Sequence, residues 1–175
     1  VFALELTASS SLPLDMPLIY RNLPKAWLRP DDLEARSQTM LGALQAGIAF
    51  SNASVALVHG MSRPVGALFH VAHGISNAAL LGVVMEFSLP GNPKRYADIA
   101  RAMGVDCPAQ ADDATVAQAG ADAVKALIAA LEVPGLQQLG VSREKLDPVV
   151  AKMAEDALAS GSPGNNPRLA RKQEI

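Results

Sequence analysis

Apolar residues recur at helical spacing along most of this chain, and this periodicity constrains the fold more than any other feature. After Pro30, apolar side chains return every three or four positions, as in Leu41, Leu44 and Ile48. No run of β-branched residues alternates with polar ones, which is the pattern of a half-buried strand. Only 4% of the residues are aromatic, and alanine and leucine, the best helix formers, supply much of the apolar volume. The pattern predicts an all-α fold, a helical bundle of six to eight helices.

Prolines, glycines and capping residues divide the chain into separate helices. Asp31 and Asp32 can begin one helix, and Asp112 or Asp113 another. Pro93 suits a first helical turn, whereas Pro64 is expected to end a helix. Serines and prolines break the pattern near the start, so residues 1–17 are expected to be irregular. The expected helices cover residues 17–23, 31–49, 53–62, 73–89, 92–103 (with Gly104 as C-cap), 112–131 and 142–158.

Length and charge exclude several classes of protein. A chain of 175 residues fits one domain. The net charge of −2 gives no electrostatic reason to expect binding to nucleic acid or to an anionic membrane, and no apolar stretch approaches the length of a membrane span. The start, VFALELTASSSLPL, has no basic residues and contains Glu5, unlike a secretory signal. With Cys107 as its one cysteine, the chain is expected to be cytoplasmic.

All three histidines, His59, His70 and His73, fall within the short stretch VHGMSRPVGALFHVAHG. Neutral imidazole is a common ligand of divalent metals, and Gly66 and Gly74 could allow tight turns that bring the rings together. The same residues could equally be helix-end and surface histidines. Spacing alone does not decide between these readings, because a gap of this length specifies no geometry.

The stretch AGIAFSNASVALVHGMSRPVGALFHVAHGISNAALLGVVMEFSLPG resembles the signature of the iron-containing (group III) alcohol dehydrogenases, and MAEDALASGSPGNNPR resembles a later segment of that family. The resemblance covers roughly residues 18–168. It implies that residues 18–175 form the family's C-terminal helical metal-binding domain. It also implies that His59 and His73 are metal ligands, that His70 is not, and that Arg63 lies near the nicotinamide of NAD(P).

The chain departs from the family in ways that bear on activity. Family members begin with an α/β dinucleotide-binding domain, but no glycine-rich loop follows a strand here, so no such domain is expected in this chain. The family completes its metal site with an aspartate and a histidine four residues apart. The corresponding stretch, VFALELTASSSLPLDMPL, has no histidine, and Asp15 and Glu5 are its nearest carboxylates. The family's prolines are replaced by Ala72 and Gly82.

Two functions remain open. The chain could be the metal-binding half of an NAD(P)-dependent dehydrogenase that is inactive alone, because the cofactor domain and two ligands are missing. Two imidazoles would then hold a divalent metal (iron or zinc) weakly, and NAD(P) would need a separate nucleotide domain. Alternatively, the chain is a stand-alone helical oligomerisation or binding module without catalysis. Either way, helices that evolved against a cofactor domain expose an apolar face, so we expect a homo-oligomer, most simply a dimer.

Other catalytic groups have weaker support. No G-x-S-x-G motif surrounds any serine near the histidines, which argues against a hydrolase. Cys107 precedes Pro108 and fits a bystander thiol better than a nucleophile. Ser162, Asn165 and Asn166 lie in a loop that the resemblance places beside the active-site cleft, although a plain turn explains them equally well.

Overall fold

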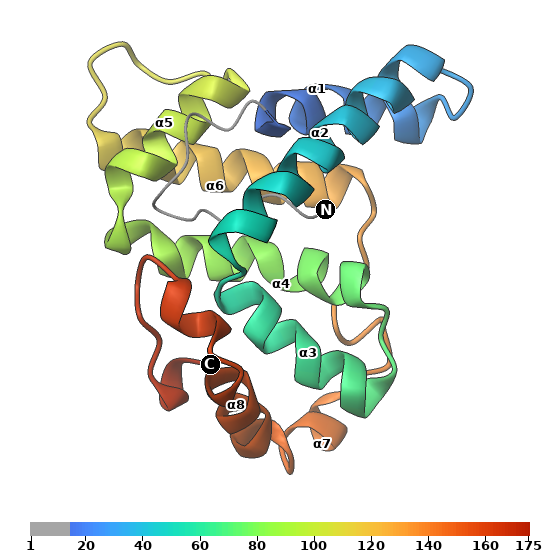
Figure 1. The fold of residues 1–175 in the computed structure, drawn as a ribbon, viewed down its shortest axis with the longest axis vertical. Helices are drawn as coiled ribbons and strands as arrows, with labels where there is room; N and C mark the ends of the chain where they lie inside the picture. The colour runs from blue at the N-terminus through green and yellow to red at the C-terminus, as the bar shows by residue number, and fades with distance from the viewer. Residues whose placement is uncertain (1–14) are drawn as a thin grey trace.

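A computed structural model describes residues 15–175, and within this part of the chain all regular structure is helical (Figure 1). The predicted all-α bundle is confirmed. Residues 1–14, with Glu5 and most of the segment expected to be irregular, lie outside the described residues. The elements are α1 (Asp15–Leu28), α2 (Leu33–Ala53), α3 (Leu57–Phe69), α4 (His73–Ser88), η1 (Leu89–Gly91), α5 (Pro93–Met103), α6 (Asp113–Ala130), α7 (Arg143–Leu146), α8 (Val150–Ala159), η2 (Ser162–Asn165) and η3 (Lys172–Glu174).

The predicted helix caps form as the sequence suggests. The side chain of Asp32 accepts a hydrogen bond from the Ala35 amide at the start of α2, and Asp112 does the same for α6. Asn92, which was expected only to begin the next helix, caps α5 in the same way, with Pro93 in the first turn. Gly104 ends α5 with a φ of 79°, which glycine adopts without strain.

Several predicted helix boundaries are wrong. The break expected between residues 49 and 53 lies at residues 54–56, because α2 continues to Ala53 and α3 begins at Leu57. Three other differences occur at prolines. Helix α1 begins at Asp15 and runs through Pro24 to Leu28, so residues 15–17 are helical and the helix is longer than expected. Met16, at its start, is buried in the main core, and the helix continues although Pro24 cannot make its backbone hydrogen bond. Pro64 lies inside α3 rather than after it. Pro148 has the opposite effect, because it lies between α7 and α8, which were expected to form one helix.

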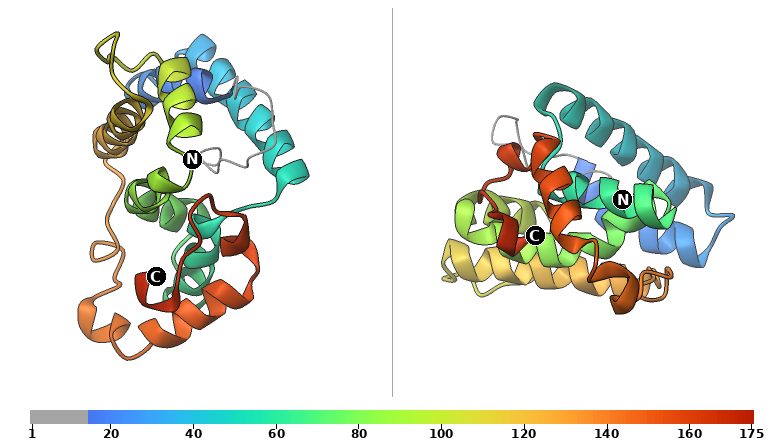
Figure 2. Two further views of the ribbon diagram at one scale, coloured as in Figure 1. Left: turned by 90° about the vertical axis from the view of Figure 1, so that its left-hand side faces the viewer. Right: turned by 90° about the horizontal axis from the view of Figure 1, so that it is seen from below.

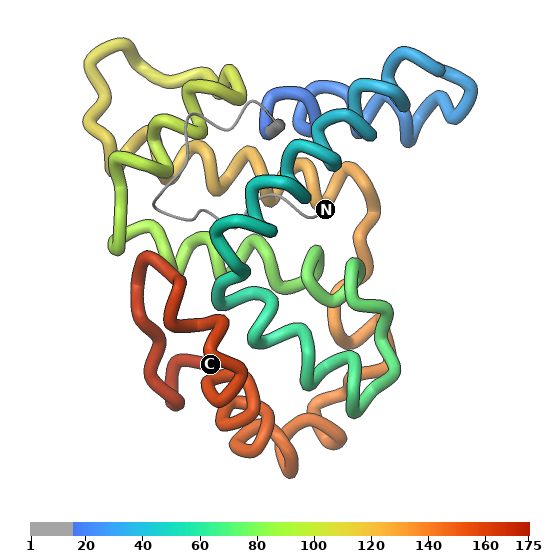
Figure 3. Tube along the Cα trace, in the orientation of Figure 1, coloured from blue at the N-terminus to red at the C-terminus, as the bar shows by residue number. Residues whose placement is uncertain are grey.

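The main hydrophobic core lies between α1, α4, α5 and α6, with α5 and α6 packed side by side (Figures 1 and 2). Tyr96, Ile99 and Met103 of α5 and Val124 of α6 are almost completely buried there. A second cluster joins α3 to α8 through Val65, Val71 and Met153. Helix α4 therefore connects the two halves, as the chain trace shows in Figure 3.

Helix α2 packs small residues inward and leaves most of its large apolar residues exposed. Ala35, Gly42 and Ala46 are buried, and α1 is the helix that α2 contacts most. We call the exposed set the α2 apolar face; it consists of Leu33, Met40, Leu41, Leu44 and Ile48, which are 43–76% exposed. Among the described helices, none alone has the length and apolarity of a membrane span. Only α2 and α3 taken together pass that test, and they are bent by 100° at their junction.

Candidate functional site

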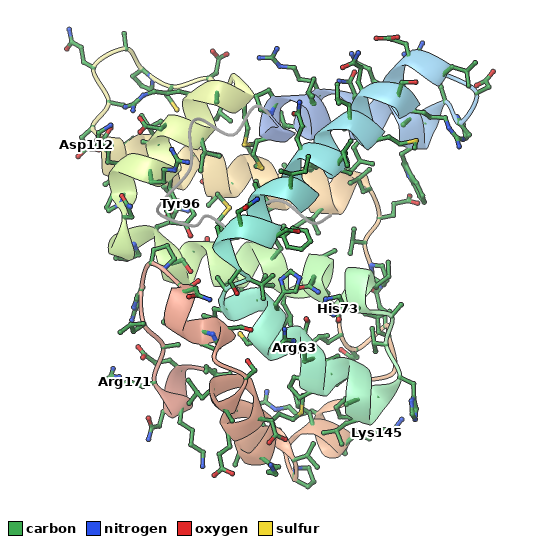
Figure 4. The ribbon with its side chains drawn as sticks, viewed as in Figure 1. Arg63, His73, Tyr96, Asp112, Lys145 and Arg171 are labelled. Carbon is green, nitrogen blue, oxygen red and sulfur yellow. The ribbon has the colours of Figure 1, made fainter. Side chains whose placement is uncertain are left out.

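Two of the three histidines meet at the starts of neighbouring helices. His59 is the third residue of α3 and is buried, while His73 is the first residue of α4 and is exposed (Figure 4). Their ring centroids are 5.0 Å apart, with the ring planes at 61°. The ring of Phe50 from α2 also lies near His59, with the ring centroids 6.5 Å apart. The imidazoles that the resemblance singled out are therefore neighbours, although they are 14 positions apart in sequence.

Two buried polar side chains, Ser62 and Asn77, lie within hydrogen-bonding distance of the His73 ring. The Ser62 Oγ lies 3.4 Å from His73 Nδ1 and donates a hydrogen bond of 3.2 Å to the His59 carbonyl. The Asn77 Nδ2 donates to the His73 carbonyl at 2.8 Å and lies 3.3 Å from Nδ1 and 3.2 Å from Nε2 of the ring. Ser62 is fully buried and Asn77 nearly so, while the Asn77 Oδ1 is buried without a partner.

Sequence reasoning missed both of these residues as parts of the site. Ser62 is one of the serines near the histidines that were considered only as possible nucleophiles, and Asn77 was given no role. Each follows a histidine by one helical turn, Ser62 three residues after His59 and Asn77 four residues after His73. Residues at these spacings are neighbours on a helix surface, so the pattern contained the signal.

His70 and the nearby glycines play structural parts. His70 is exposed and ends α3 as its C-cap, in the left-handed region with a φ of 56°. It takes no part in the ring pair, in keeping with the resemblance. Gly66 and Gly74 lie inside α3 and α4, so the prediction that they form the turn is wrong. His70 forms that turn instead. Histidine adopts this left-handed backbone conformation more readily than bulky or β-branched residues do.

Arg63 lies in the middle of α3, one turn after His59, with an exposed side chain (Figure 4). Because α3 continues to Phe69, Arg63 does not lie at a helix end. Residues four apart share a helix face. Arg63 therefore projects from the part of α3 that carries His59.

The loop around η2 holds the histidine-bearing helices in place. Asn165 donates a hydrogen bond to the Val55 carbonyl just before α3, and Asn166 donates to the Ser88 hydroxyl at the end of α4. At Gly60, next to His59, an added Cβ would lie 2.9 Å from a ring carbon of Pro163. Gly60 thus lets α3 approach this loop. Asn165 and Asn166 therefore link this loop by hydrogen bonds to the residue before the α3 N-cap and to the end of α4.

The donor set for a metal is incomplete within residues 16–175, the part of the chain whose side chains the structure describes. No group of three or more histidine, cysteine, aspartate or glutamate side chains is arranged there to hold an ion. Catalytic zinc sites commonly use three protein ligands with water in an open position. The adjacent imidazoles of His59 and His73 therefore fit a divalent ion as part of a ligand set, and the described residues supply no third ligand.

Known proteins resemble this chain over nearly all of its length. The model of the family described as "Fe-containing alcohol dehydrogenase family, C-terminal" matches residues 10–175. The 1,3-propanediol dehydrogenase of Citrobacter freundii is 36% identical over 159 residues, which are 90% of this chain and 40% of that protein. Lactaldehyde reductase of Escherichia coli (strain K12) is 37% identical over 145 residues, or 82% and 37%.

Solved structures agree with the sequence relatives. A 1,3-propanediol oxidoreductase superposes with a TM-score of 0.86 at 34% identity, covering 93% of this chain and 41% of that one. An alcohol dehydrogenase from Oenococcus oeni superposes with a TM-score of 0.84 at 30% identity, covering 93% and 42%. The chain spans about two fifths of the length of the relatives it matches.

Proposed function

Because the chain belongs to the Fe-containing alcohol dehydrogenase family and matches its C-terminal part, we propose that it supplies the metal-binding half of such a site. His59 and His73 are the two ligands in this proposal. The observation that carries it is the ring pair, with centroids 5.0 Å apart at the starts of α3 and α4. Imidazole suits zinc and iron alike. In a complete site, the ion would act as a Lewis acid on the alcohol oxygen.

We further propose that this chain alone does not oxidise alcohols. Two imidazoles bind a divalent ion weakly, and the described residues add no third donor. Hydride transfer also needs NAD(P), and the relatives are more than twice as long as the region they share with this chain. A nucleotide domain outside these residues would bring the nicotinamide towards Arg63, which is exposed on α3. A cytoplasmic location remains a prediction that rests on the single cysteine.

Metal binding to the purified chain tests the ligand assignment. Zn²⁺ titration by calorimetry and metal content by mass spectrometry would be measured for the wild type and for the His59→Ala, His73→Ala double variant. His70→Ala is the matched control, because it removes the third histidine of the same stretch from outside the ring pair. We expect the wild type and His70→Ala to bind alike, and the double variant to bind at least about tenfold more weakly. Equal binding by all three proteins would refute the assignment.

An activity assay tests the second part of the proposal. The chain would be incubated with 1,3-propanediol or lactaldehyde, the substrates named for its relatives, and with NAD⁺, NADP⁺ or their reduced forms. We expect no turnover above buffer, even with added zinc or iron(II). Turnover that is abolished by His59→Ala would show that the chain is a complete catalyst.

A second candidate function, a helical oligomerisation module, is favoured by the α2 apolar face. Residues 37–62 contain no Asp, Glu, Lys or Arg, although much of α2 is exposed. Cores of protein interfaces are depleted of charged residues in the same way. In this proposal, two copies of the chain pack through α2 about a two-fold axis.

Light scattering over a tenfold concentration range tests this candidate. We expect a dimer that Leu44→Glu converts to a monomer. Val83→Glu is the control, because Val83 is also exposed but lies on α4. A wild-type chain that stays monomeric throughout would rule out the dimer.

A further inference from the structure

The hydroxyl of Ser62 connects the two histidines, and its single hydrogen decides how. The Oγ lies 3.2 Å from the His59 carbonyl and 3.4 Å from His73 Nδ1. A carbonyl oxygen can only accept, so the bond to His59 uses the one hydrogen that a serine hydroxyl carries. Towards His73, the Oγ can then act only as an acceptor. The donor in that contact must be a protonated Nδ1.

Burial makes this arrangement persistent. Ser62 is fully buried, so water does not compete for its hydroxyl. The Asn77 amide does not distinguish the two tautomers. Its Nδ2 donates one hydrogen to the His73 carbonyl at 2.8 Å and lies almost equally far from Nδ1 and Nε2 of the ring, at 3.3 Å and 3.2 Å. With Nδ1 protonated, Nε2 holds the lone pair that a metal ion needs.

We propose that Ser62 is a positioning residue that selects the Nδ1–H tautomer of His73 and thereby presents Nε2 as the ligand atom. The inference builds on the proposed function, because it describes how one of the two ligands is prepared. Metal-bound histidines commonly donate their other ring N–H to a fixed acceptor, which sets the tautomer and the ring orientation. Here the acceptor comes from α3, and the same hydroxyl binds the backbone of the other ligand residue.

Nuclear magnetic resonance of the metal-free full chain tests the tautomer directly. In ¹⁵N-labelled protein at pH about 8, where an unperturbed histidine is neutral, protonated and unprotonated ring nitrogens resonate far apart. We expect Nδ1 of His73 to be protonated in the wild type and in Ser76→Ala. Ser76 is the matched control, since it is also fully buried and its Oγ donates to the His73 carbonyl rather than the ring. We expect Ser62→Ala to shift His73 towards the Nε2–H form. An Nε2–H tautomer in the wild type, or no change in Ser62→Ala, would overturn the inference.

Zn²⁺ titration of the same variants gives an independent measure. We expect Ser62→Ala to weaken binding about 10- to 100-fold, and Ser76→Ala to bind like the wild type. Equal losses in both variants would mean that Ser62 acts only by stabilising the packing of α3 against α4, and would overturn the inference. The two proposals can be refuted independently. If the tautomer is as expected but no zinc binds, the proposed metal site is wrong and the role of Ser62 in selecting the tautomer stands. If zinc binds to the two histidines of a chain with the Nε2–H tautomer, the metal site stands and the role of Ser62 is wrong.

Discussion

Gly91→Ala is expected to destabilise the chain strongly, although Gly91 lies at an exposed end of η1. A Cβ added there would lie 2.3 Å from the carbonyl carbon of Pro167 and 2.5 Å from the amide nitrogen of Arg168. Carbon atoms pack best at about 3.5–4.0 Å, so one of the two backbones must move by about 1 Å. Neither contact is the end of a flexible side chain that could rotate away.

The cost follows from what that movement disrupts. Overpacking of this kind costs about 1–3 kcal/mol. Moving residues 166–168 also disturbs the buried bond from Asn166 to Ser88 and the bond from Arg168 to the Phe87 carbonyl, worth about 1 kcal/mol each. We therefore expect a loss of about 2–4 kcal/mol, and a fall in Tm on the order of 10 °C for a domain of this size.

Urea unfolding followed by circular dichroism measures the loss, with Gly164→Ala as the matched control. The same methyl group is added there, but no heavy atom lies within 4 Å of its position. We expect Gly164→Ala to stay within about 0.5 kcal/mol of the wild type, as surface substitutions usually do. Equal stability of the two variants would refute the close packing of η1 against residues 167–168.

Three further predictions address other parts of the fold. Gly60→Ala places its Cβ 2.9 Å from Pro163, so we expect a net loss of about 1 kcal/mol despite the gain in helix propensity; a higher Tm would contradict this. Ser54 has a φ of 65° and a ψ of −177°, a backbone conformation almost exclusive to glycine. Ser54→Gly should relieve this strain and raise the free energy of unfolding by about 1 kcal/mol, which a higher urea midpoint would show. A lower midpoint would contradict the strain. The hydrogen bond and charge of Arg171 lower the pKa of Glu174 to about 2. Because this folded-state pKa is depressed, the stabilisation is present above the unfolded pKa of about 4.3 and is lost as the pH falls towards 2. Glu174→Gln should therefore be less stable than the wild type at pH 7, and the difference should shrink across that window; a pH-independent difference would disprove the pairing.

Local features of the fold could be predicted from the sequence, because a few neighbouring residues determine them. The caps at Asp32, Asn92 and Asp112 depend on a side chain that reaches an amide three residues away. The prolines were harder to interpret. Pro64 and Pro148 have similar local chemistry, yet the first lies inside α3 and the second between two helices. Packing against distant segments decides whether a helix continues through a proline, and the spacing of apolar residues in the sequence does not reveal that packing.

The candidate site was predicted in part, for a related reason. The motif indicated His59 and His73, and the structure brings their rings together. The periodicity of α2 indicated a helix with an apolar stripe, but it could not show that this stripe is exposed while Ala35 and Ala46 are buried. Periodicity identifies the faces of a helix, whereas the neighbours that cover each face come from elsewhere in the fold.

The hydrogen bonds between the η2 loop and the segments that carry the histidines affect the order in which parts of the molecule fold during synthesis. Val55 and Asn165 are 110 positions apart, and Ser88 and Asn166 are 78 apart. During synthesis, the segment with both histidines leaves the ribosome long before the loop that anchors it. Domains generally fold as units, and α3 and α4 cannot make their contacts with this loop before it has emerged. The packing of the histidine-bearing helices against this loop is therefore among the last parts of the fold to form.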